Sequence, residues 1–107
     1  MDSEARLMEL KKRKMVTIVA ESSIEAPIIK SLKRQGARGY TLIGAQGEGS
    51  RGVRQGDWDQ ARNIFIQTIC SAEIAHDIMN ALYEEFYDDY AIIAYLTDIE
   101  VHRENKF

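Results

Sequence analysis

The sequence is poor in the residues that build covalent or metal-bound frameworks. Among its 107 residues there is one cysteine and there are two histidines, and no Cys/His cluster has the spacing of a zinc site. A single cysteine excludes an internal disulfide and favours a reducing cytoplasm. Cys70 has no basic neighbour in sequence, so we interpret it as a core or strand-end thiol rather than a nucleophile. We interpret His76 and His102 as surface residues.

Long apolar runs and an excess of positive charge are also missing. No stretch approaches the roughly 20 apolar residues that span a bilayer, and the charged N-terminus lacks the apolar stretch of a secretory signal. The net charge of −3 argues against charge-driven binding to nucleic acid or membranes. The residues that are present, 45% hydrophobic and 29% charged, suit a single folded domain.

The first residues are polar. We treat 1–14 as a polar N-terminal extension and 15–107 as one domain, and Leu7 and Leu10 allow a short helix in the extension. The basic run "KKRK" at 11–14 is interpreted as a solvated lead-in, with binding of anions or nucleic acid as the alternative.

The spacing of apolar residues beyond this point predicts elements in the order β-α-β-β-α-β. Strands are expected at 15–21, 40–46, 62–70 and 91–101, helices at about 24–35 and between Ser71 and Phe86, and a turn at 87–90. Ser22 and Ser23 offer caps for the first helix and Ser71 offers one for the second, while Gly36 is the natural end of the first helix.

This order suggests an α+β, ferredoxin-like fold, in which two helices cover one face of a four-stranded antiparallel sheet. Here a long loop joins the second and third strands. The 91–101 strand is apolar on both faces, and the 15–21 strand is nearly so. Because a sheet buried on both faces has this pattern, we expect other copies of the chain to cover the second face, giving a homo-oligomer.

The loop at 47–61 begins with "GEGSRGV" and is long for a hairpin connection. Glycines let a backbone approach a bound group, and successive N–H groups form a nest for anions. Arg51 and Arg54 add guanidinium forks suited to phosphate. Neither the Walker A nor the Rossmann pattern is present. Composition alone leaves two interpretations open, an anion-binding loop and a merely mobile one. Trp58 either packs on its own loop or anchors a protein partner.

Two stretches carry a family resemblance: "GARGYTLIGAQGEGSRGVR" at 36–54 and "FYDDYAIIAYLTDIEV" at 86–101. With the element order, they resemble the PII signalling superfamily, most closely PII-like proteins of inorganic-carbon metabolism. Those proteins are partnered with a bicarbonate transporter or associated with the carboxysome. The resemblance spans about 15–103. It implies a non-enzymatic homotrimer that binds adenine nucleotides between subunits, with no cofactor, catalytic residue or metal.

The resemblance also assigns residues. The opening of the second strand would lie beside the adenine and ribose, the base of the long loop would wrap the phosphates, and the turn before the last strand would face the ligand across the cleft. The implied nucleotide-binding residues are Gly39, Tyr40, Thr41, Gly47, Gly49, Ser50, Arg51, Arg54, Gln67, Tyr90, Ala91, Ile92 and Arg103.

The sequence departs from PII proteins at three places. Trp58 is the only aromatic residue of the loop, so no tyrosine is available there for uridylylation. The lysine-rich turn before the last strand is replaced by "YDDYAII", which favours ADP, AMP or cyclic AMP over ATP. The chain ends in "HRENKF", without the cysteine tail of some transporter-linked relatives. These departures favour the carboxysome-associated type, for which the resemblance also implies bicarbonate near the phosphates.

Three alternatives remain at this point. One is slow nucleotide hydrolysis at the same cleft, which requires a carboxylate to hold a metal, and Glu48 is the only acid in the motif. The second is a metal-sensing PII-like protein, and the third is a structural ferredoxin-like module without a small ligand. In the favoured interpretation, the 47–61 loop docks a bicarbonate transporter or a carboxysome-linked protein.

Overall fold

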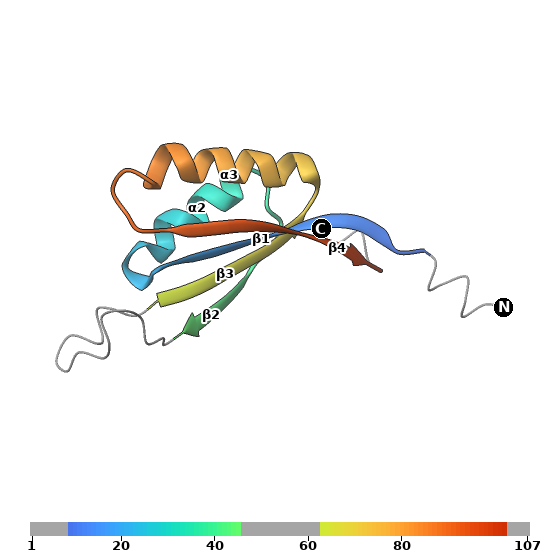
Figure 1. Cartoon of the computed structure of the whole chain (residues 1–107), viewed down its shortest axis with the longest axis horizontal. Helices are drawn as coiled ribbons and strands as arrows, with labels where there is room; N and C mark the ends of the chain where they lie inside the picture. The colour runs from blue at the N-terminus through green and yellow to red at the C-terminus, as the bar shows by residue number, and fades with distance from the viewer. Residues whose placement is uncertain (1–8, 46–62, 103–107) are drawn as a thin grey trace.

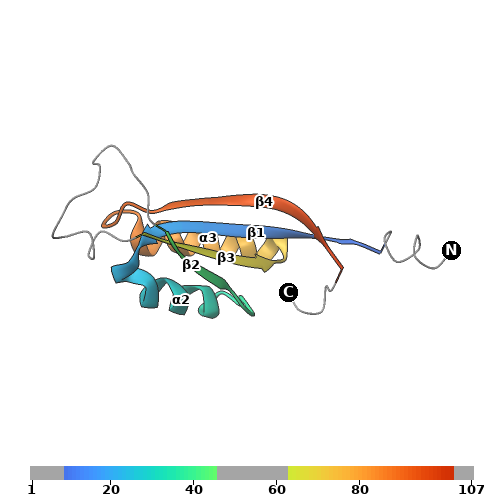
Figure 2. The same cartoon turned by 90° about the horizontal axis from the view of Figure 1, so that it is seen from below.

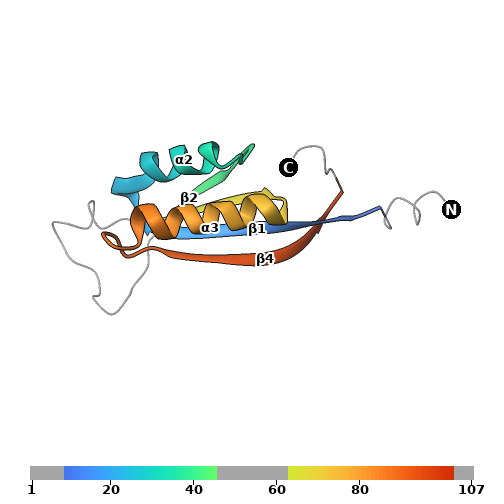
Figure 3. The ribbon, with the colours of Figure 1, turned by 90° about the horizontal axis from the view of Figure 1, so that it is seen from above.

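The computed structural model describes residues 9–45 and 63–102. They form a four-stranded antiparallel sheet in the order β2-β3-β1-β4 with both helices on one face, shown in Figure 1 and from above in Figure 3. The elements are β1 (Lys11–Glu21), the 3₁₀ turn η1 (Ser22–Ile24), α2 (Glu25–Arg34), β2 (Thr41–Ala45), β3 (Asn63–Cys70), α3 (Ala72–Phe86) and β4 (Ile93–Val101). The predicted α+β, ferredoxin-like fold is confirmed.

The hydrophobic core lies between the helices and the sheet. Side chains alternate between the two faces of each strand, so β1 and β3 each send every second residue into this layer. The helices contribute one apolar stripe each. The buried core residues are Val16, Ile18, Ala20, Ile24, Ile28, Ile29, Leu32, Ile64, Ile66, Cys70, Ala75, Ile78, Leu82 and Phe86.

The predicted serine cap of the first helix is wrong. Ser22 and Ser23 lie in η1, and α2 begins after Ile24 with no side-chain capping bond. Pro27 is the third residue of α2 and has no N–H, so one of the donors that a capping hydroxyl normally receives is missing.

The other predicted helix ends are confirmed. Ser71 caps α3, because its Oγ accepts a hydrogen bond from the Ile74 N–H at 3.2 Å. Gly36 follows the C-terminus of α2 with φ of +105°, a conformation that favours glycine. The Ala37 N–H then donates to the Leu32 carbonyl at 3.0 Å, which closes the helix end.

The first strand is longer than predicted, because β1 begins at Lys11 rather than at residue 15. The basic run therefore belongs to the sheet and is not a solvated lead-in. It pairs with the end of β4, and the register sets Lys12 opposite Glu100 and Lys14 opposite Asp98. Opposite charges across a strand pair stabilise it. The basic run alone gave no sign of this, because the acidic partners lie at the far end of the sequence.

Both helices of the described ranges lie on one face of the sheet, and neither covers the second face (Figure 2). The register places the odd-numbered residues of all four strands on this face, including Ile43 beside Phe65, Val19 beside Phe65, and Ile93 beside Val19. Ile43, Ile93 and Tyr95 are 48%, 62% and 46% exposed. We call this surface the open face. Residues 9–45 and 63–102 leave these side chains exposed, and the apolar pattern of the strands predicted a second apolar face.

Neither helix in the described ranges has the length and apolar character needed to cross a bilayer. Cys70 is buried at the end of β3, as predicted, and both histidines are on the surface. Burial raises the pKa of the Cys70 thiol, so the thiol stays protonated at neutral pH.

Candidate functional site

The opening of β2 is held by a buried hydroxyl. The Thr68 side chain is 2% exposed, and its Oγ1 donates to the Gly39 carbonyl oxygen at 2.6 Å. This bond fixes the backbone just before β2, while the ring of Tyr40 stays on the surface and is 44% exposed. The segment therefore combines a fixed backbone with an accessible aromatic side chain.

Gln67 lies beside this segment, because it is the register partner of Thr41. Its Nε2 atom donates to the Thr17 hydroxyl oxygen at 3.4 Å, a long hydrogen bond. Thr17 is fully buried on β1 even though it belongs to the open face. An amide held by its nitrogen leaves its carbonyl oxygen free to accept a hydrogen bond from a ligand.

The turn between α3 and β4 is the other described part of the predicted site. The Tyr90 N–H donates to the Phe86 carbonyl at 2.9 Å, and the Ile92 N–H donates to the Tyr90 carbonyl at 3.1 Å. Ala91 is exposed. The side chain of Ile92 packs against the core and its N–H is already bonded to Tyr90, so its carbonyl oxygen is the polar group that it can offer a ligand.

These two parts do not meet within one chain. β2 and β4 are the outer strands of the sheet, with β3 and β1 between them. Three strand spacings of about 4.8 Å separate them, roughly 14 Å in all. Gly39, Tyr40 and Thr41 lie at one edge, and the turn at 90–92 lies at the other. The described residues of the predicted site therefore form two separate groups on one chain.

The remaining predicted residues, Gly47, Gly49, Ser50, Arg51, Arg54 and Arg103, lie outside the described residues, as does Trp58. The described ranges place only the two ends of the loop. β2 ends at Ala45 and β3 begins at Asn63, and these two residues are register partners at the same end of the sheet.

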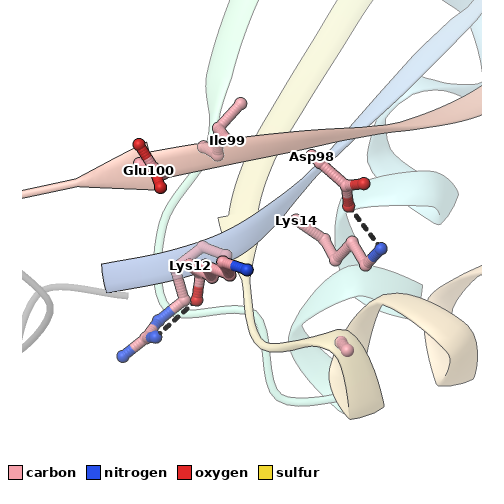
Figure 4. Close-up of a pocket in the computed structure, with 7 residues that line it drawn as sticks. Lys12, Lys14, Asp98, Ile99 and Glu100 are labelled. Carbon is pink, nitrogen blue, oxygen red and sulfur yellow. Dashed lines mark hydrogen bonds and ion pairs between the residues drawn. The ribbon is translucent and has the colours of Figure 1, made fainter. Parts of the chain in front are cut away.

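A groove of about 630 Å³ lies elsewhere, where β1 and β4 extend beyond the start of α3 (Figure 4). It contains none of the predicted site residues, and its lining residues are Lys12, Arg13, Lys14, Ala72, Asp98, Ile99 and Glu100. The Lys14 ammonium forms an ion pair with the Asp98 carboxylate, as the dashed line shows. This hydrogen bond and the positive charge of Lys14 lower the pKa of Asp98.

The groove offers little for catalysis. Its two acids lie opposite two of its three basic residues across the β1–β4 pair, Lys12 opposite Glu100 and Lys14 opposite Asp98. Within 9–45 and 63–102, no three His, Cys, Asp or Glu side chains come together to hold a metal. We therefore interpret the groove as part of the strand pairing and not as an active site.

Two residues of the site were missed by the sequence reasoning. Thr68 holds Gly39 and Thr17 holds Gln67, and neither threonine was among the predicted site residues. A polar residue inside an otherwise apolar strand was the available signal, because buried hydroxyls need partners.

The fold and its long second connection define the class of this protein as a ferredoxin-like α+β domain. Within that class, the chain belongs to the nitrogen regulatory protein P-II family, which it matches over residues 13–106. It is a PII-like signalling protein. Proteins of this family are generally signalling regulators rather than enzymes.

Solved structures agree with this assignment. A PII-like signalling protein from Thermus thermophilus is 47% identical with a TM-score of 0.81, and the match covers 94% of this chain and 99% of that one. CPII from Thiomonas intermedia K12, bound to ADP and bicarbonate, is 26% identical with a TM-score of 0.78, covering 92% and 96%. CPII bound to ADP, AMP and bicarbonate is 27% identical with a TM-score of 0.76, covering 92% and 95%.

Proposed function

We propose that this protein is a non-enzymatic cytoplasmic sensor that binds adenine nucleotides, ADP or AMP first among them, in clefts between three copies of the chain. The observation that carries the proposal is the separation of the two described parts of the site. Gly39–Thr41 with Gln67 and the turn at 90–92 lie at opposite edges of one sheet. A neighbouring copy brings such edges together.

The open face supports the assembly. Ile43, Ile93 and Tyr95 form an exposed apolar surface on a sheet whose other face is already covered. Burying such a surface against other copies lowers the free energy by roughly 25 cal/mol per Å². The trimer is the form that the family resemblance implies. Its mass in solution, measured by light scattering, tests this part of the proposal, and a monomer at all concentrations would contradict it.

Chemistry at the cleft follows from the fixed groups. Thr68 fixes the backbone before β2, so that the adenine can approach it closely. Thr17 holds the Gln67 amide, which we propose faces the edge of the adenine. The arginines of the loop supply charge-assisted hydrogen bonds to phosphate. Bicarbonate is a second proposed ligand, supported by the ADP-bound and bicarbonate-bound structures of CPII. The regulated process is then inorganic-carbon uptake or carboxysome function, with loop 47–61 docking the partner.

Calorimetric titration tests the ligand. ADP, AMP, ATP and cyclic AMP are each added with and without bicarbonate to the folded oligomer. We expect binding of ADP or AMP, and tighter binding when bicarbonate is present. A folded oligomer that binds none of these nucleotides would refute the proposal. Formation of ADP from ATP and Mg²⁺ in a parallel incubation would favour slow hydrolysis instead.

Arg51 is the residue of the loop with the sharpest expected effect. Arg51→Ala should weaken nucleotide binding by about 1.5–3 kcal/mol, the range of a hydrogen bond to a charged group. The same titration measures this change, and Arg34→Ala is the matched control, since Arg34 instead pairs with Glu85 at 3.0 Å. Equal affinity for wild type and Arg51→Ala removes Arg51 from the site.

A further inference from the structure

Two tyrosines form an exposed pair near the C-terminus of α3. Tyr83 is 68% exposed and Tyr87 is 37% exposed. Their ring centroids are 5.7 Å apart in an edge-to-face arrangement. We call this pair the tyrosine patch. Large, rigid aromatic side chains that have both apolar and polar atoms are enriched at protein interfaces, so an exposed pair of them marks a candidate docking surface.

The tyrosine patch is surrounded by negative charge. Glu84 follows Tyr83, and Asp88 and Asp89 follow Tyr87, and all three acids are exposed. The sequence from 71 to 102 contains no lysine or arginine. In the part of the chain that the structure describes, neither Glu84 nor Asp88 has an ion-pair partner, whereas Glu85 pairs with Arg34.

These acids do not stabilise the helix that carries them. The last turn of α3 contains no basic residue, and the carbonyl end of a helix carries partial negative charge, which disfavours nearby carboxylates. Asp88 lies two residues beyond Phe86, the last residue of α3, so its carboxylate adds to the negative charge at this helix end. A bound cationic group would relieve this effect, so the local electrostatics favour a positively charged partner.

The position of the tyrosine patch also fits a partner. The register pairs Val19 with Ile93, Glu21 with Asn63 and Asn63 with Ala45. The turn after α3 therefore lies at the end of the sheet where β2 ends and β3 begins, as Figure 1 shows. A partner that docks at this end through loop 47–61, as in the proposed function, would reach the tyrosine patch as well.

We propose that the tyrosine patch docks an arginine-containing, basic segment of a partner protein, and this rests on the proposed signalling function. A guanidinium group stacks on one of the two tyrosine rings, while the carboxylates of Glu84 and Asp88 accept its hydrogen bonds. Arginine suits the surface better than lysine, because its planar, weakly hydrated head stacks on aromatic rings and forms paired bonds to carboxylates.

Titration of the ¹⁵N-labelled full chain with a synthetic peptide tests the proposal. The probe is an acetylated glycine–serine peptide with two arginines four residues apart, and the same peptide with lysines is the comparison. We expect amide shift changes centred on residues 83–89 and tighter binding of the arginine peptide. Tyr83→Gln with Tyr87→Gln should weaken binding about tenfold, which corresponds to about 1.4 kcal/mol.

A matched pair of variants separates local docking from net charge. Glu84→Gln with Asp88→Asn should weaken binding of the arginine peptide and raise the melting temperature. Glu73→Gln with Asp77→Asn removes the same charge at the other end of α3 and should leave binding unchanged. Equal weakening by both pairs, shifts centred on Asp98 and Glu100, or no binding at millimolar peptide would each overturn the proposal.

Two single variants separate this proposal from the proposed function. Calorimetry with ADP should give wild-type affinity for the single variants Tyr83→Gln and Glu84→Gln, because both residues lie in α3 and outside the turn at 87–90. If the wild-type protein binds nucleotide but does not bind the peptide, only the proposed docking surface is overturned. Failure of wild type to bind any nucleotide overturns the proposed function, and peptide docking at residues 83–89 is measured independently of it.

Discussion

The two faces of the sheet are built from the same strands but are completed in different ways. Even-numbered strand residues face the helices, and those at the centre, such as Val16, Ile18 and Ile66, are fully buried within one chain. Odd-numbered residues face away from the helices, and Ile43 and Ile93 are among the most exposed apolar residues described. One face therefore holds the chain folded, and the other is available for further copies.

The residues that form and support the proposed site lie on both faces of the sheet. Gln67 and Thr17 are odd-numbered neighbours on β3 and β1, so the predicted adenine contact belongs to the open face. Thr68 is on the helix face but fixes Gly39 at the edge of β2. Substitutions on the two faces are thus expected to change different measured quantities.

A core variant on the helix face should show the largest effect on the chain itself. Ile18→Ala leaves a cavity beside α2 and α3 and should lower the free energy of unfolding by about 2–5 kcal/mol. Urea denaturation followed by circular dichroism measures this. Ile93→Ala is the matched control on the open face, and an equal loss from both variants in the monomer would contradict the distinction between the faces.

A charge on the open face should act on assembly instead. Ile93→Glu would bury a carboxylate without a partner in the proposed trimer, at a cost of several kcal/mol per interface. We expect a lower mass by light scattering with the circular dichroism spectrum of the folded chain retained. Glu100→Gln serves as control because Glu100 lies on the helix side, opposite Lys12. A trimer that survives Ile93→Glu at micromolar concentration would place Ile93 outside the interface.

The hydroxyl beneath the site should have an intermediate effect. Thr68→Val keeps the shape of the side chain but leaves the Gly39 carbonyl without its donor, which should cost about 1–2 kcal/mol of stability. Nucleotide affinity should fall in the same variant, because the backbone before β2 is then less fixed. Thr97→Val, at an exposed threonine of β4, should leave the stability of the fold unchanged.

The charged end of the β1–β4 pair should give the smallest effect. Lys14 lowers the pKa of Asp98, so this carboxylate stabilises the fold above its ordinary pKa, and the contribution disappears as the pH falls through the lowered value. The Asp98 side chain is 84% exposed, so the effect is small and salt-sensitive. Melting curves of wild type and Asp98→Asn should converge in acid. Curves that diverge as the pH falls would contradict this sign.

Local pattern was enough to predict the order of elements and the two faces of the strands. Alternation in "RNIFIQTIC" and the four-residue spacing of Ile74, Ile78 and Leu82 report burial directly. The start of β1 at Lys11 was missed because its cause is a pairing with Asp98 and Glu100, which are distant in sequence. The serine cap of α2 was mispredicted because Ser22 and Ser23 form a 3₁₀ turn, which leaves Ile24 as the residue before the helix.

The arrangement of the candidate site could not be predicted from the local sequence pattern. Gly39, Gln67 and Tyr90 came from a family resemblance, and the spacing of residues does not show that the first two lie across the sheet from the third. Strand order supplies that information. The supporting roles of Thr17 and Thr68 depend on hydrogen bonds between strands, which become visible only when the strands are in register.

Cys70 is a natural reporter of local opening in this fold. It is the sole thiol of the chain, it ends the strand that carries Gln67 and Thr68, and its sulfur lies under the helices with a raised pKa. An alkylating reagent can reach it only during the moments when β3 separates from its cover. The alkylation rate of Cys70 therefore measures how often β3, which carries part of the proposed nucleotide site, opens. A ligand that stabilises this site should lower that rate.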